Sequence, residues 1–131
     1  MIADLLHFKI AAVAGVSTRV SPDLRRGTGD ALPCVVYEIE ADDRLDLIDP
    51  AYTFGRSACT VHCLALTLNA AIAIAEDITA GMHGATWTVG AAEAIKCRVL
   101  SMQTGTLDDS ESGATDLTRT ATLRLDILHK F

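Results

Sequence analysis

The sequence predicts an α+β fold in which a small, mixed and mostly antiparallel sheet of four to five strands carries two packed helices. Two stretches, 2–15 and 70–82, place apolar residues at helical spacing. Three others, 34–40, 56–68 and 118–127, alternate between two side-chain sets with the period of a strand. No linker or internal repeat divides the 131 residues, so we expect a single domain that spans the whole chain.

The first segment, residues 2–15, is predicted as an amphipathic helix. Ile2, Leu6 and Ile10 recur every four residues and therefore line one stripe. Gly15 follows as a stop signal.

Residues 17–33 are predicted as a loop because two glycines and a proline punctuate them, with a short strand around Arg19 and Val20 as an alternative for part of it. Pro33 then opens the strand at 34–40, where proline is tolerated as the first residue. One face of that strand holds Val35, Tyr37 and Ile39.

The stretch from 41 to 55 is predicted as an exposed loop. It is rich in aspartate and ends in turn-forming residues, Asp49-Pro50 and Gly55. Its other aspartates are Asp42, Asp43 and Asp46.

Residues 56–68 carry the clearest strand pattern, and both of its faces are largely apolar in the second half, as expected for a central strand. Asn69 is predicted to cap the helix at 70–82, and Gly84 lies where that helix should end. The buried face of this helix is predicted to hold Ala71, Ile74, Ala75, Ile78 and Met82.

The remaining segments are predicted as a short strand at 86–92, a strand at 94–102, a loop at 105–116 and a final strand at 118–127. In the final strand the apolar face holds Ala121, Leu123, Leu125 and Ile127. We expect this strand and the one at 34–40 to be edges that a neighbouring subunit pairs or covers.

Composition excludes several classes of protein. The net charge of −6 argues against general nucleic-acid binding, which needs lysine and arginine facing phosphates. No apolar run reaches the roughly 18 residues that a membrane span requires. The start carries Asp4 before any basic residue, so we expect no secretory signal and therefore reduced, buried cysteines at positions 34, 59, 63 and 97.

Cys59, His62 and Cys63 form the one sequence cluster that resembles a metal site. Side chains alternate along a strand, so the two cysteines share a face and the histidine points to the other. A zinc site needs four convergent ligands, and we therefore expect core packing and neither metal nor cofactor. No nucleophile elbow or phosphate-binding glycine loop is present, and we expect no enzymatic activity.

Charged clusters are the remaining candidates for contact with partners. A basic group lies at 19–26 and acidic pairs lie at 42–43 and 108–109; each is read either as solvated loop charge or as an interaction surface. The candidate interaction residues are Arg19, Arg25, Arg26, Asp42, Asp43, Asp46, Asp108 and Asp109.

The ordered set of segments resembles the bacteriophage tail-completion proteins, also called tail terminator or tail-to-head joining proteins. The most specific piece is Leu-Pro-Cys-Val-Val-Tyr-Glu at 32–38. The turn at 18–20, the strand at 60–66, the helix ending in Met-His-Gly at 82–84 and the strand at 119–127 follow in the family's order. The sequence departs from the family at Cys63 and Leu64, in the strand centre, and in the acidic stretch at 41–55.

The resemblance implies a virion protein, assembled in the bacterial cytoplasm, that forms a ring, expected to be a hexamer, at the head-proximal end of a tail. Its partners would be copies of itself, the tail tube protein and the head connector or stopper protein, while DNA passes through the lumen without specific binding. The stretches at 41–55 and 105–116 are the candidate contacts to tube or connector. The resemblance leaves open a phage, a defective prophage or a gene-transfer particle.

The alternative is a small α+β ligand-binding or enzymatic domain. Such a domain predicts a pocket with perturbed titratable groups, near His62 or His83.

Overall fold

A computed structural model of the chain describes residues 2–13, 20–21, 34–45, 54–107 and 118–130, with residues 2–3, 13, 20–21, 41–45, 107 and 118 described by their backbone alone. The helices are α1 (Ile2–Val13) and α2 (Leu68–Met82). The strands are β1 (Val20–Ser21), β2 (Cys34–Leu45), β3 (Phe54–Ala65), β4 (Trp87–Val89), β5 (Ala92–Leu107) and β6 (Thr118–Lys130).

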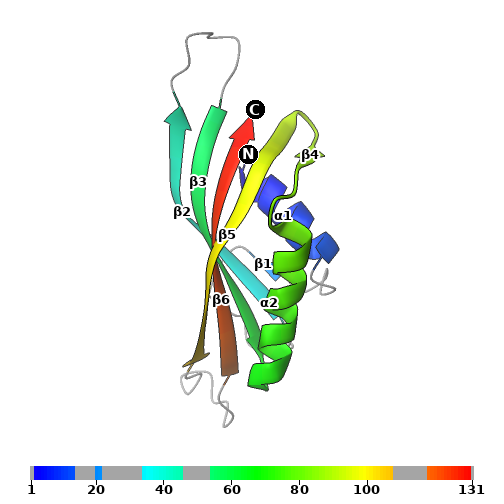
Figure 1. The fold of residues 1–131 in the computed structure, drawn as a ribbon, viewed down its shortest axis with the longest axis vertical. Helices are drawn as coiled ribbons and strands as arrows, with labels where there is room; N and C mark the ends of the chain where they lie inside the picture. Colours follow the sequence, from blue (N-terminus) through cyan, green and yellow to red (C-terminus); the bar gives the residue numbers. More distant parts are fainter. Residues whose placement is uncertain (1, 14–19, 22–33, 46–53, 108–117, 131) are drawn as a thin grey trace.

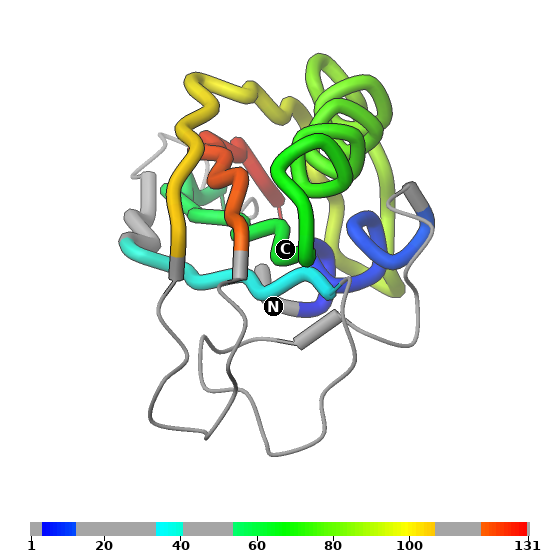
Figure 2. The backbone as a smooth tube through the Cα atoms, turned by 90° about the horizontal axis from the view of Figure 1, so that it is seen from below, coloured from blue at the N-terminus to red at the C-terminus, as the bar shows by residue number. Residues whose placement is uncertain are grey.

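The strands form one sheet in the order β1-β2-β3-β6-β5-β4 (Figure 1). The two-residue β1 runs parallel to β2, and the other four pairings are antiparallel. The predicted α+β class and the mixed, mostly antiparallel sheet with two helices are therefore confirmed, with β1 raising the strand number to six within the described ranges. Figure 2 shows how strongly the sheet curls.

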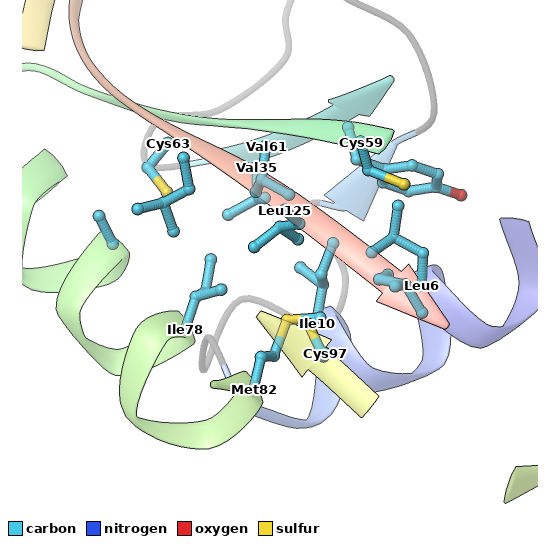
Figure 3. Close-up of a cluster of buried hydrophobic side chains, with 14 of the residues drawn as sticks. Leu6, Ile10, Val35, Cys59, Val61, Cys63, Ile78, Met82, Cys97 and Leu125 are labelled. Carbon is cyan, nitrogen blue, oxygen red and sulfur yellow. The ribbon is translucent and has the colours of Figure 1, made fainter. Parts of the chain in front are cut away.

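Both helices pack against the same face of the sheet. The main buried cluster joins Leu5, Leu6 and Ile10 of α1 to apolar residues of α2 and of the strands (Figure 3). The buried residues of α2 are the predicted five: Ala71, Ile74, Ala75, Ile78 and Met82. The four residues predicted for the apolar face of the final strand are also buried in this cluster.

A single hydrogen bond ties α1 to the far end of the sheet. Trp87 Nε1 in β4 donates to the Leu5 carbonyl at 2.8 Å, and Lys9 Nζ lies 5.6 Å from the centre of the indole ring. Because Trp87 is itself buried, this hydrogen bond fixes the position of α1 over β4.

The ends of α2 differ from the prediction at its start. Thr67, not Asn69, is the N-cap, and its side chain accepts a hydrogen bond from Ala70 N at 3.2 Å. The preceding strand correspondingly ends at Ala65, three residues earlier than predicted. The other end is as expected, since Gly84 follows the helix with a φ of +75° that glycine adopts readily.

β2 and β5 continue past their predicted ends into segments predicted as loops. β2 continues through Ala41–Leu45, which the sequence assigned to the acidic loop, and β5 continues to Leu107, into the predicted loop at 105–116. The register shifts between Ile39 and Ala41 in β2, and between Val99 and Ser101 in β5. Each shift breaks the two-residue alternation from which a strand is recognised in sequence.

The final strand is not an edge, contrary to the prediction. β6 lies in the middle of the sheet and pairs with β3 from Ala65 to Phe54 and with β5 from Leu107 to Glu93. β3 is central, as predicted, because it lies between β2 and β6. No helix in the described ranges combines the length and the apolar character needed to cross a membrane.

Candidate functional site: the open face of the sheet

The face of the sheet opposite the helices carries the main concentration of charged and polar side chains in the described chain. Cross-strand partners share a face, so the pairing registers identify its members. They are Glu38 of β2; Arg56, Thr60 and His62 of β3; Thr122, Arg124 and Asp126 of β6; and Lys96 and Arg98 of β5. Glu40 of β2 joins them through its hydrogen bonds to Thr60 and Arg124.

Two carboxylates on this open face are held by arginines. Arg124 Nη2 donates to Glu40 Oε2 at 3.1 Å, and Thr60 Oγ1 donates to the other oxygen of Glu40. Arg56 donates to Asp126 through Nε at 3.0 Å and through Nη2 at 2.8 Å. These hydrogen bonds and the charge of Asp126 raise the pKa of Arg56 above its ordinary value.

His62 bridges two neighbouring strands on the same face. Its Nδ1 shares a hydrogen bond of 3.0 Å with Thr122 Oγ1, and its Nε2 lies 3.5 Å from Glu38 Oε2. The ring is therefore anchored to β6 by one hydrogen bond, while its Nε2 faces Glu38 of β2 without one.

A basic pocket lies on the open face beside the Arg56–Asp126 pair. Its volume is about 340 Å³, and its lining consists of Arg56, Lys96, Arg98, Asp126 and Leu128. Three of these five side chains are cationic and one is anionic, so the pocket is positively charged in a chain whose net charge is −6. Such a pocket suits carboxylates or phosphates.

A second pocket, of about 370 Å³, lies between α2 and β5. Its apolar part includes Leu100 and Met102, whose side chains are 57% and 45% exposed. Its polar part comes from the α2 residues Glu76 and Thr79. This pocket has no concentration of charge, and we assign no chemistry to it.

The cysteines are buried and unsuited to nucleophilic chemistry. All four are thiols outside any disulfide, and Cys59, Cys63 and Cys97 point into the core (Figure 3). Burial raises the pKa of both the Cys63 and the Cys97 thiol to about 12, so the reactive thiolate is disfavoured at neutral pH. The predicted arrangement is confirmed: Cys59 and Cys63 lie in the core, and His62 points to the open face. Within the described residues, no group of three or more potential ligands could hold a metal ion.

A buried pair formed by Ser57 and His129 was not predicted from the sequence. Ser57 Oγ and His129 Nε2 lie 2.8 Å apart, and the two side chains are 0% and 1% exposed. The alternation of β6 places His129 on the same face as Leu125 and Ile127, so its burial could have been predicted from the sequence. Because both side chains are almost completely shielded from solvent, the pair is a packing contact between β3 and β6.

The structure places two of the eight predicted interaction residues. Asp42 and Asp43 lie in β2, in register with Ser57 and Arg56. The other six, Arg19, Arg25, Arg26, Asp46, Asp108 and Asp109, lie outside the described residues. The sequence did not single out the charged residues of the open face, because they are far apart in the chain and only the pairing register gathers them.

The chain matches no family model and no curated protein. Its fold does match a chain from a solved structure described as "Virion of native gene transfer agent (GTA) particle". The match covers 92% of this chain and 84% of that chain, with a TM-score of 0.56 and 15% sequence identity. At this level of identity the comparison establishes a shared fold.

Proposed function

We propose that this protein is a structural component of a phage-like virion that forms a ring at the head-proximal end of a tail. There it ends polymerisation of the tail tube and joins the tail to the head connector. The observation that carries the proposal is the fold shared, over 92% of the chain, with a protein of a gene-transfer particle. The proposal has two steps: the protein is a component of a virion, and within the virion it is the tail terminator.

The terminator role is supported by the order of the sequence motifs. Leu-Pro-Cys-Val-Val-Tyr-Glu leads into β2, where Val35 and Tyr37 are buried in the main core. The strand and helix motifs that resemble the tail-completion family occupy β3, α2 and β6. The resemblance therefore covers the elements that build the fold, as expected for homologous architecture.

The chemistry of the described residues favours a structural role over a catalytic one. The alternative of an enzyme or ligand-binding domain predicted a site near His62 or His83. His62 is hydrogen-bonded to Thr122 and lies beside Glu38, and His83 Nδ1 accepts the backbone N–H of Val99 at 3.0 Å. Both histidines therefore serve contacts within the sheet or at its border.

A ring assembled head to tail requires two different surfaces on each subunit. The sheet offers them, because its two borders are built from different strands, β1 and β2 on one side and β5 and β4 on the other. A hexamer is the ring size that we propose, on the strength of the family resemblance.

The test combines light scattering across a concentration series with negative-stain imaging, with and without purified tail tubes. We expect rings of about six subunits and, when the protein is added to polymerising tube protein, tubes that stop growing at capped ends. A chain that stays monomeric in both conditions, and leaves tube growth unchanged, would contradict the proposal.

A further inference from the structure

The basic pocket contains two cations that the described part of the chain leaves available. Asp126 is occupied by Arg56, whereas Lys96 and Arg98 are exposed and have no ion pair or hydrogen bond among the described residues. Farther along the same face, the carboxylate of Glu40 is paired with Arg124, and Glu38 lies 3.5 Å from His62 Nε2. The pocket is therefore a place where positive charge remains to be matched by another molecule.

One row of cross-strand partners passes through the residues that line the basic pocket. The register runs from Asp43 in β2 through Arg56 in β3 and Leu128 in β6 to Lys96 in β5. The row is thus acidic where it meets the β2 border and basic where it meets the β5 border. Figure 1 shows these two strands on opposite sides of the upper half of the sheet.

Contact at the basic end must use side chains, because the backbone of β5 is already bonded there. Gly84 N donates to the Cys97 carbonyl at 2.7 Å, and Val99 N donates to His83. A partner cannot extend the sheet at these positions, but it can lie over the open face, where the pocket of about 340 Å³ has room for carboxylates.

We propose that this basic pocket receives Asp43, at the acidic end of β2 and in register with Arg56 of the open face, from a second copy of the chain. The inference rests on the proposed ring and names the contact that closes it. In a head-to-tail ring every subunit presents the same edge to its neighbour at the same height, so the acidic end of one row faces the basic end of the next. This pairing fixes the register of neighbours that would otherwise repel, since each subunit carries a net charge of −6.

The test is charge reversal at each side of the contact. Lys96→Glu/Arg98→Glu should raise the dissociation constant for subunit association by about tenfold or more, measured by light scattering or sedimentation. Asp43→Lys should do the same. Arg119→Glu is the matched control, because Arg119 is exposed, bonds Thr106 and lies outside the pocket, and its reversal should leave association unchanged. Circular dichroism establishes that each variant is folded.

Mixing the two reversed variants gives the decisive measurement. In a ring where the two variants alternate, each interface then joins an acidic surface to a basic one. The dissociation constant for subunit association should therefore return to within about threefold of that of the original protein. Normal assembly of Lys96→Glu/Arg98→Glu alone, or no recovery on mixing, would overturn the inference while leaving the ring itself in place.

Two further outcomes also decide the matter. If the original protein retards duplex DNA on a gel, and Lys96→Glu/Arg98→Glu abolishes this without affecting assembly, the pocket serves phosphates and the inference is wrong. If the original protein stays monomeric with and without tail tubes, the proposed function and the inference fail together.

Discussion

Gly55 of β3 packs directly against the ring of His129 in β6, and adding one carbon at position 55 tests this contact. It pairs with His129 across β3 and β6, and the imidazole occupies the space that a side chain at position 55 would need. A Cβ at position 55 would lie 2.5 Å from His129 Cε1, a distance that carbon atoms do not tolerate. His129 is 1% exposed and is bonded to Ser57, so it has little freedom to move aside.

The expected cost of Gly55→Ala follows from three contributions. Overpacking a filled interior costs about 1–3 kcal/mol, and loosening the Ser57–His129 hydrogen bond costs about 0.5–1.5 kcal/mol more. The lower entropy of the unfolded chain with alanine returns about 0.4–1 kcal/mol. We therefore expect the free energy of unfolding to fall by about 0.5–4 kcal/mol, with a central value of about 2 kcal/mol.

The assay is equilibrium unfolding in urea at one fixed protein concentration, since association would shift the midpoint. Gly105→Ala is the matched control: its Cβ would meet Thr120 Oγ1 at 3.3 Å at an exposed site, and we expect a change within about 0.5 kcal/mol. In a His129→Ala background, Gly55→Ala should cost almost nothing, because the clashing ring is gone. An equal cost in both backgrounds, or no difference from Gly105→Ala, would refute the reasoning.

Three other substitutions or conditions test the remaining structure. Trp87→Phe removes the hydrogen bond to the Leu5 carbonyl and should cost about 1 kcal/mol in urea unfolding, with faster amide exchange in α1. Ile78→Ala empties a fully buried site between α2 and the sheet and should cost about 2–5 kcal/mol by the same measurement. The Cys63 and Cys97 thiols have pKa values raised from 9.0 to about 12, so folding favours their protonated form. Stability from this source is complete below pH 9 and is lost as the pH rises from 9 towards 12, by about 1.4 kcal/mol per unit per thiol. Cys63→Ala/Cys97→Ala should flatten that slope between pH 9 and 11.

The sequence was sufficient to predict the fold class and the buried faces. Apolar periodicity correctly gave the α2 face, from Ala71 to Met82, and the apolar face of β6, because burial on one side is what imposes the pattern. It did not place β6 in the sheet, since a long strand with one apolar and one polar face has the same pattern at an edge or at the centre.

The candidate site was largely beyond sequence reasoning. Lys96 and Arg98 are unremarkable residues of a predicted strand, and only the register with Asp126 and Leu128 brings them into a basic pocket with Arg56. The strand extension that places Asp42 and Asp43 in register with β3 follows a bulge, which interrupts the alternation on which the strand prediction depended.

The central position of β6 has a consequence for how the protein reaches this structure. β6 inserts between β3 and β5, both of which precede it in the chain, and its pairing with β3 joins residues more than fifty positions apart. During synthesis the two flanking strands must wait, with open inner edges, until residues 118–130 have left the ribosome. Chains interrupted before that point would present two long unpaired edges, which are templates for aggregation. We therefore expect folding to be slow and governed by the topology of the sheet, with subunit assembly starting only after β6 has closed it.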